Sequence, residues 1–292
     1  MDTLEGSNEE YAMADYQATP PPAVDPGNTI GIVGLILAII PCTSTIGLVL
    51  SVLAAALVAV ASAARAVPTA AGACELPQGA ERVAIDPADF TTRIDNTWWP
   101  MTPGSRWVYR ETAPDGTAQR VVVTVLHKTK LIANGVRARI VHDAVTEDGK
   151  PVEVTNDWYA QDRCGSVWYL GEDTKEYENG KVVSTKGSFE AGVDGAQPGV
   201  IVPAKPRPGM RYRQEYYAGH AEDRAEVFSL TERAEVPFGY FRKGRVLMTR
   251  DLNPLEPKVL EYKFYARGIG PVLAIGVSGG SDREELVSYR RG

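Results

Sequence analysis

Glycine-containing turns recur at regular intervals through residues 104–292 and constrain the fold more than any other feature. Short segments of alternating apolar and polar residues separate these turns, and no long amphipathic helix interrupts them. A glycine at such a position supplies the positive φ that a tight hairpin needs. A spacing of about 12 to 16 residues is typical of antiparallel hairpins. The clearest turns are Pro114-Asp115-Gly116, Asn134-Gly135, Glu147-Asp148-Gly149, Arg163-Cys164-Gly165 and Glu178-Asn179-Gly180.

About a dozen strands are expected, in two groups. The first group covers residues 104–112, 118–132, 136–146, 151–161, 166–177 and 181–189, and the second covers 210–218, 224–233, 245–252, 258–266, 270–277 and 284–289. Residues 190–208 are rich in Gly and Pro and are expected to form a long loop between the groups. An open sheet of this size would expose long edges. The sequence therefore predicts an all-β domain, an antiparallel up-and-down meander that closes into a barrel or half barrel.

A run without charged side chains precedes this domain. Residues 29–64 form 36 consecutive uncharged residues, more than the about 20 that cross a bilayer as a helix. The run predicts a transmembrane helical segment, and Pro41 is expected to break it. Three topologies remain open: a single anchor over residues 46–64, a signal peptide cleaved near residues 64–66 or before Cys74, and a helical hairpin.

The expected organisation has four parts. Residues 1–28 form a disordered acidic, Pro-rich tail, 29–66 a transmembrane or signal-anchor segment, 67–88 a linker and 89–292 the β domain. We expect the protein to be at the cell membrane through residues 29–64, with its β domain extracytoplasmic. Arg65, the only base near the run, would by itself favour a cytoplasmic domain.

Charge excludes one class of partner. Residues 1–75 carry seven acids and one base, which accounts for the formal net charge of −6 and leaves the rest of the chain neutral. A nucleic-acid-binding protein needs a basic surface to face phosphates. We therefore expect no nucleic-acid partner.

The cysteines offer two alternatives. Cys74 follows Ala71-Gly72-Ala73, a stretch similar to a bacterial lipobox, which makes Cys74 a candidate lipidation site. Cys74 could instead be a free linker cysteine, or pair with Cys164 in an oxidising compartment.

Strand registers were predicted from the turns. A two-residue turn at Asn134-Gly135 would pair Val125 with Ala144 and His127 with His142. Three-residue turns would pair Trp107 with Val123, His142 with Val154, Asn156 with Glu172 and Trp158 with Leu170. The expected core face then collects Trp107, Tyr109, Val121, Val123, Val125, Ile140, Ala144, Val152, Val154, Trp158, Trp168 and Leu170.

The same registers predict a polar patch on this core face. It would consist of His127, His142, Asn156 and Glu172, and Trp107, Trp158 and Trp168 would surround it. Such a patch suits a small amphipathic ligand. Two imidazoles and a carboxylate are also ligands for a divalent metal such as Zn²⁺, so His127, His142 and Glu172 are candidate metal ligands. The alternative is a hydrogen-bonded structural network, and no other cofactor is expected.

Familiar catalytic signatures are absent from the sequence, including G-x-S-x-G, H-E-x-x-H, C-x-x-C and a phosphate-binding glycine loop. The leading prediction is therefore a membrane-tethered extracytoplasmic β domain that binds a small ligand or a cell-envelope component without catalysis. One alternative is a metal-dependent, hydrolase-like enzyme that uses the His/His/Glu set. The other is a structural envelope protein.

Several stretches of the β domain carry a family resemblance. They include Ile94-Asp95-Asn96-Thr97-Trp98-Trp99-Pro100, Thr102-Pro103-Gly104-Ser105-Arg106-Trp107-Val108-Tyr109, and residues 157–162, 171–180, 187–199, 212–217 and 264–270. Over residues 86–289 the chain resembles an uncharacterised family of actinobacterial secreted or lipid-anchored proteins. The resemblance implies export and an antiparallel β fold, and no activity. Residues 28–64 resemble a small two-helix membrane module.

Overall fold

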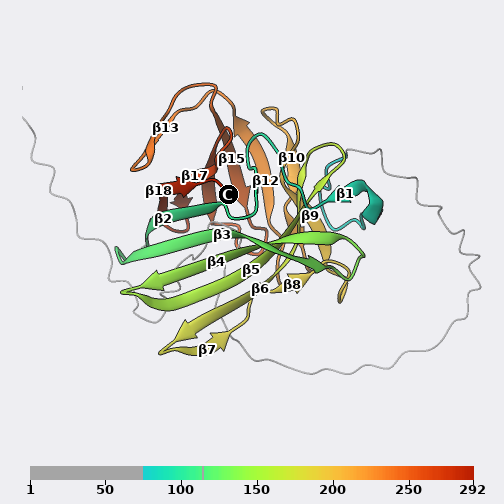
Figure 1. Ribbon diagram of the computed structural model, residues 1–292, viewed down its shortest axis with the longest axis horizontal. Helices are drawn as coiled ribbons and strands as arrows, with labels where there is room; N and C mark the ends of the chain where they lie inside the picture. Colours follow the sequence, from blue (N-terminus) through green and yellow to red (C-terminus); the bar gives the residue numbers. More distant parts are fainter. Residues whose placement is uncertain (1–74, 114) are drawn as a thin grey trace, which may run out of the picture.

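The computed structural model describes residues 75–113 and 115–292 (Figure 1). The predicted tail, the membrane segment and the part of the linker up to Cys74 lie outside these residues. Within the described part of the chain, no helix is long and apolar enough to cross a bilayer.

Two runs of antiparallel strands form the domain, which is all-β as predicted. The first run is β2 (Arg106–Thr112), β3 (Ala118–Leu131), β4 (Arg137–Glu147), β5 (Lys150–Asp162) and β6 (Val167–Glu178). The second is β12 (Arg224–Ser229), β15 (Val246–Leu252), β16 (Leu260–Ala266), β17 (Gly270–Ser278) and β18 (Arg283–Arg290). The last strand, β18, pairs with β2 and joins the two runs into one sheet.

The sheet curls until its ends nearly meet (Figure 1). Its path ends at β10 (Arg211–Arg213) on one side, and at β9 (Gln197–Val202) and β11 (Glu215–Tyr216) on the other. At this seam, a Cβ added to Gly199 would lie 2.3 Å from the backbone carbonyl carbon of Gln214. Only glycine permits this approach of two backbones, so Gly199 allows the sheet to close into a barrel-like shape.

Most predicted strands are confirmed to within a few residues, and the exceptions are short. The segment expected as one strand over 181–189 forms β7 (Lys181–Ser184) and β8 (Phe189–Glu190). The segment expected as one strand over 210–218 likewise forms two strands, β10 and β11, which pair with β12 and β9. The expected loop over 190–208 contains β9, which is buried and pairs with β6, so that prediction was wrong for residues 197–202. The remaining unpredicted elements are a one-turn 3₁₀ helix (Pro87–Asp89), β1 (Phe90–Thr91), β13 (Ala234–Val236) and β14 (Gly239–Phe241).

The β3–β4 hairpin differs in register from the prediction. Its loop has three residues, Ala133-Asn134-Gly135, because Ile132 N–H donates to the Val136 carbonyl oxygen at 2.9 Å. Leu131 therefore pairs with Arg137. A one-residue slip turns every following side chain to the opposite face of the sheet. On β4 the inward residues are consequently not the predicted Ile140, His142 and Ala144 but their neighbours Val141, Asp143 and Val145.

A bulge in β3 changes the register again. The pairing of Val125 with Val141 is followed by that of Thr129 with Arg139, so three residues of β3 face one residue of β4. The carbonyl oxygens of Leu126, His127 and Lys128 point to Arg139, whose Nη1 lies 3.1–3.4 Å from all three. Arg139 therefore satisfies the backbone groups that the bulge removes from the ladder.

The turn after β4 is one residue shorter than predicted. Asp148 and Gly149 both have positive φ, and Glu147 pairs with Lys150, which makes a two-residue turn where three residues were expected. A bulge between Val145 and Thr146 then shifts the register by one more residue, so His142 pairs with Asn156 rather than with Val154. Between β5 and β6, a bulge in which Leu170 and Gly171 of β6 face Trp158 brings Asp157 opposite Glu172.

Candidate functional site

The structure does not bring the predicted polar patch together. His127 lies in the β3 bulge and is exposed, and His142 faces Thr124 across the ladder rather than His127. His142 Nδ1 and Asn156 Oδ1 are 3.0 Å apart on the half-buried outer side of the sheet. Glu172 points instead to the interior. The predicted juxtaposition of both histidines with Glu172 was wrong, because the β3–β4 slip placed His142 on the opposite face.

The three tryptophans are buried but do not surround one site. Trp107 donates its indole N–H to the Ile269 carbonyl oxygen at 3.0 Å. Trp158 has the ammonium of Lys130 3.9 Å from its ring centroid. Trp168 donates to Asp162 Oδ2 at 2.8 Å and meets Phe90 edge to face. These contacts place all three in the packing of the barrel wall.

The predicted metal site has no counterpart among the described residues. No three His, Cys, Asp or Glu side chains within residues 75–113 and 115–292 converge as metal ligands would. Cys164 is disulfide-bonded. The other two cysteines of the chain, Cys42 and Cys74, lie outside the described residues.

Acidic side chains accumulate inside the barrel instead. We call them the interior acidic cluster; its members, each at most 5% exposed, are Glu111, Asp143, Glu153, Asp157, Glu172, Glu215, Asp223, Asp251, Asp282 and Glu284. Among the described residues only three basic side chains are buried, Arg139, Arg213 and Lys263. Two of them serve the backbone: Arg139 in the β3 bulge, and Arg213 at the carbonyl oxygens of Gly79, Glu81 and Pro198. Lys263 is therefore the one buried cation that faces the cluster in the described part of the chain.

Neighbouring strands set these acids directly opposite one another. Asp157 pairs with Glu172 across β5 and β6, and Glu111 pairs with Glu284 across β2 and β18. Side chains opposite one another in a ladder are separated by roughly 5 Å at Cβ, and like charges in that position destabilise the sheet. The barrel thus brings carboxyl groups into register rather than spreading them apart.

Lys263 neutralises one side of the interior. Its Nζ lies 3.0 Å from Asp251 Oδ2 and 3.1 Å from Glu261 Oε2. Burial alone would lower the Lys263 pKa, but the two carboxylates outweigh it and hold that pKa well above its ordinary value. Lys263 is therefore fully committed to its own partners, and the acids of β2, β4, β5 and β6 have no comparable partner among the described residues.

Many oxygens of the cluster make no hydrogen bond to the described part of the chain. They include both carboxylate oxygens of Asp143 and one each of Asp157, Glu172, Glu215 and Glu284. The hydroxyls of Tyr159 and Tyr212, also fully buried, are likewise without a partner within the described residues. Buried polar atoms without a partner carry a large desolvation cost. This part of the interior therefore has unused capacity to bind donors.

Burial changes the protonation of these acids. It raises the pKa of Asp143 to about 7. Burial, together with repulsion from Asp282 and Asp143, raises the pKa of Glu111 to about 8. Burial and neighbouring carboxylates also raise the pKa values of Asp157, Glu172 and Glu284 well above the ordinary range. Near neutral pH Asp143 and Glu111 therefore stand between their protonated and ionised forms.

Tyr169 gives independent evidence for a shared proton. Its hydroxyl lies 2.9 Å from Asp157 Oδ1 and 2.8 Å from Glu172 Oε2. A phenol has one proton and can donate to only one of the two oxygens. The other contact requires a proton on Asp157 or Glu172, so one carboxyl of this pair is neutral in this arrangement.

Of this site, only Glu172 was predicted from the sequence. The strand segments that carry most of the cluster, such as Glu153-Val154-Thr155-Asn156-Asp157, alternate apolar and polar residues, and the apolar set was assigned to the core. The sequence signal that could have revealed the site is the recurrence of Asp and Glu at the same parity on adjacent strands.

Comparisons with known proteins add little about function. No family model matches the chain, and no curated protein matches it. One similar solved structure is a lipoprotein candidate from Parabacteroides distasonis, with 12% identity, a TM-score of 0.37, and coverage of 67% of this chain and 99% of that one. Another is a β-barrel-like protein of a domain of unknown function from Brucella abortus, with 14% identity, a TM-score of 0.32, and coverage of 65% and 97%.

Proposed function

We propose that this protein is a membrane-tethered, extracytoplasmic β domain that binds a small organic cation at its interior acidic cluster. The observation that carries the proposal is the set of buried carboxylate oxygens that have no hydrogen-bond partner among the described residues and lie near buried tyrosine hydroxyls such as that of Tyr159. The ligand class is an aliphatic amine or guanidinium with two or more cationic N–H donor groups.

The chemistry of the cluster favours this class. Ammonium and guanidinium groups donate several hydrogen bonds each, and their charge makes those bonds to carboxylates stronger than neutral ones. A donor between Asp157 and Glu172 would relieve the repulsion of two opposed acids. The described residues lack a convergent set of metal ligands, so an organic cation with separated donors fits the dispersed acids better than a metal ion does.

Two further features support the proposed location. Cys164 is disulfide-bonded, and disulfides persist in oxidising compartments outside the cytoplasm. Leu76, two residues after Cys74, lines the same pocket as Cys164, so Cys74 is our candidate for the bonding partner. In that case Cys74 would not be lipidated, and residues 29–64 would provide the membrane attachment.

The proposal is tested by calorimetric titration of the full chain in non-ionic detergent with spermidine. Binding should be measurable at about pH 8, because a bound cation favours the ionised form of the acids around it. When binding releases one proton from the acids, lowering the pH by one unit should weaken the binding constant by roughly a factor of ten. Each additional released proton should add roughly another factor of ten. Asp157→Asn should weaken binding at about pH 8, and Glu178→Gln, at the exposed end of β6, should not.

Each outcome separates the alternatives. Saturable binding that is lost on acidification and in Asp157→Asn supports a cation-binding domain. Equal binding by Asp157→Asn and the parent would mean that spermidine binds elsewhere. No binding of spermidine or agmatine at either pH would overturn the proposal and leave a structural envelope protein as the better account.

A further inference from the structure

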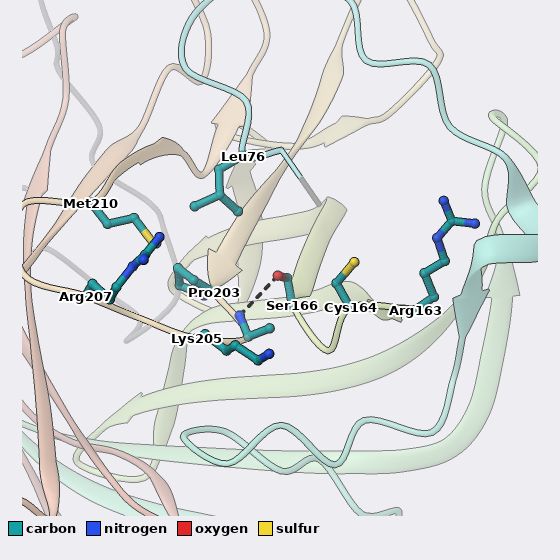
Figure 2. A pocket seen from close by; sticks show the side chains of 9 residues that line it. Leu76, Arg163, Cys164, Ser166, Pro203, Lys205, Arg207 and Met210 are labelled. Carbon is teal, nitrogen blue, oxygen red and sulfur yellow. Dashed lines mark hydrogen bonds between the residues drawn. The ribbon is translucent and has the colours of Figure 1, made fainter. Parts of the chain in front are cut away.

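A second candidate site lies on the outside of the barrel. It is a pocket of about 440 Å³ between the β5–β6 turn and the segment that follows β9 (Figure 2). Arg163, Lys205 and Arg207 contribute cationic groups to its lining, and Leu76, Met210 and Pro203 contribute apolar surface. None of the described residues that line it is acidic. The pocket is therefore opposite in charge to the interior acidic cluster.

The segment that presents the cations is stiffened by proline. Lys205 and Arg207 alternate with Pro206 and Pro208, whose rings fix φ. Ala204 N–H donates to Ser166 Oγ at 3.1 Å, drawn as the dashed line in Figure 2. Because the backbone is already restrained, less entropy is lost when a ligand orders these side chains.

Two of the three cations are uncompensated. Arg163 Nη1 lies 2.9 Å from Asp89 Oδ1 and is thus partly neutralised. Lys205 and Arg207 are exposed, and within residues 75–113 and 115–292 neither side chain makes an ion pair or a hydrogen bond. In Figure 2, Arg207 and Arg163 lie toward opposite ends of the pocket, with Lys205 between them. An anion in the pocket would therefore meet positive charge on more than one side.

The position of the pocket in the chain suggests where such an anion comes from. Leu76 is twelve residues beyond the end of the uncharged run at residue 64. An extended chain of that length reaches at most about 40 Å. If the run lies in a bilayer, as its sequence predicts, the pocket stays close to phospholipid headgroups.

We propose that this pocket binds a phosphate group, and that its source is the headgroup of an anionic phospholipid. The guanidinium of Arg207 matches the geometry of phosphate oxygens, the ammonium of Lys205 adds a second charge, and the apolar side chains accommodate the glycerol portion. This site is independent of the interior acidic cluster and does not rest on the proposed cation binding.

The test uses the full chain in lipid nanodiscs and measures amide hydrogen exchange of residues 203–210. Protection should be greater in nanodiscs of phosphatidylcholine with phosphatidylglycerol than in pure phosphatidylcholine. In parallel, inorganic phosphate is titrated into the protein in non-ionic detergent. Protection only in the anionic nanodiscs identifies the lipid, whereas saturable binding of inorganic phosphate without lipid-dependent protection would overturn the lipid source and leave a soluble phosphate ester.

A matched pair of double variants separates a site from general charge attraction. Lys205→Gln/Arg207→Gln should abolish the lipid-dependent protection and weaken phosphate binding by about tenfold or more. Arg242→Gln/Lys243→Gln removes the same two residue types at exposed positions after β14 and should change neither. Equal losses in both variants, or neither phosphate binding nor lipid-dependent protection in the parent, would overturn the proposal.

Discussion

Asp143→Asn is expected to stabilise the ligand-free protein in alkaline solution and to have little effect in acid. Asp143 is buried on β4, and its carboxylate oxygens have no partner among the described residues. Burial raises its pKa from 3.8 to about 7. Between these two values the native state binds more protons than the unfolded state, so the free energy of unfolding falls as the pH rises.

The size of this effect follows from the pKa difference. Raising the pKa from 3.8 to about 7 corresponds to about 4 kcal/mol of lost stability once the native carboxyl is fully ionised. About 3 kcal/mol of this loss develops between about pH 5 and about pH 8. Asparagine keeps the shape of the side chain without the charge. The variant should therefore gain about 3 kcal/mol on the parent over this interval.

The assay is urea unfolding of the full chain at both pH values, in buffer free of amines, for the parent, Asp143→Asn and Glu178→Gln. The control changes an exposed acid at the end of β6 and should follow the parent at both pH values. A gain for Asp143→Asn that is equal at the two pH values would show that packing, not ionisation, is responsible. If Asp143→Asn has the same free energy of unfolding as the parent at about pH 8, ionisation of Asp143 does not destabilise the native state and the reasoning is refuted.

Three further predictions test the fold that holds the cluster. Gly199→Ala should cost about 2–3 kcal/mol in urea unfolding, because its Cβ would meet the Gln214 backbone at the barrel seam; a neutral effect would mean that the seam is open. Arg139→Met should lower the free energy of unfolding by about 3 kcal/mol, because it removes the donor to the bulge carbonyls. The matched change Arg137→Met, at an exposed position on the same strand, should lower it by under about 0.5 kcal/mol. Equal losses in the two variants would contradict the role of Arg139. Cys164→Ser should lower the free energy of unfolding by about 2–4 kcal/mol under non-reducing conditions. In reductant the variant and the parent should have the same free energy of unfolding. Equal values without reductant would contradict a structural disulfide.

The sequence predicted the strands well because their boundaries are set locally. Gly116, Gly135, Gly149, Gly165 and Gly180 all adopt the positive φ expected of turn glycines. Each such turn limits where a strand can begin and end. The unpredicted strand β9 depends on pairing with β6, far away in sequence, and no local signal marks it.

Register was harder to predict because Asn-Gly and Asp-Gly pairs occur in hairpin loops of more than one length. Asn134-Gly135 was expected to form a two-residue turn and lies in a three-residue loop, whereas Asp148-Gly149 does the reverse. The register of β3 and β4 is shifted further by the bulge at residues 126–128, which Arg139 stabilises from the neighbouring strand. That contact exists only once the sheet has formed.

The candidate site was missed for a more general reason. The expected core face was chosen by placing Val152 and Val154 inward, as the hydrophobic effect favours in most barrels. In this barrel the inward residues of β5 are Glu153, Thr155 and Asp157, and the valines are half-buried outside. A rule that assigns apolar residues to the interior fails where the interior itself is polar.

The most direct test of the central claim is native mass spectrometry of the full chain extracted from its own membrane at neutral pH. We predict an adduct of one small organic cation per chain that is released on acidification, when the interior acids become neutral, and is lost in Asp157→Asn but retained in Glu178→Gln. A chain that carries no such adduct, or one that keeps it in Asp157→Asn and at acid pH, would contradict cation binding by the interior acidic cluster.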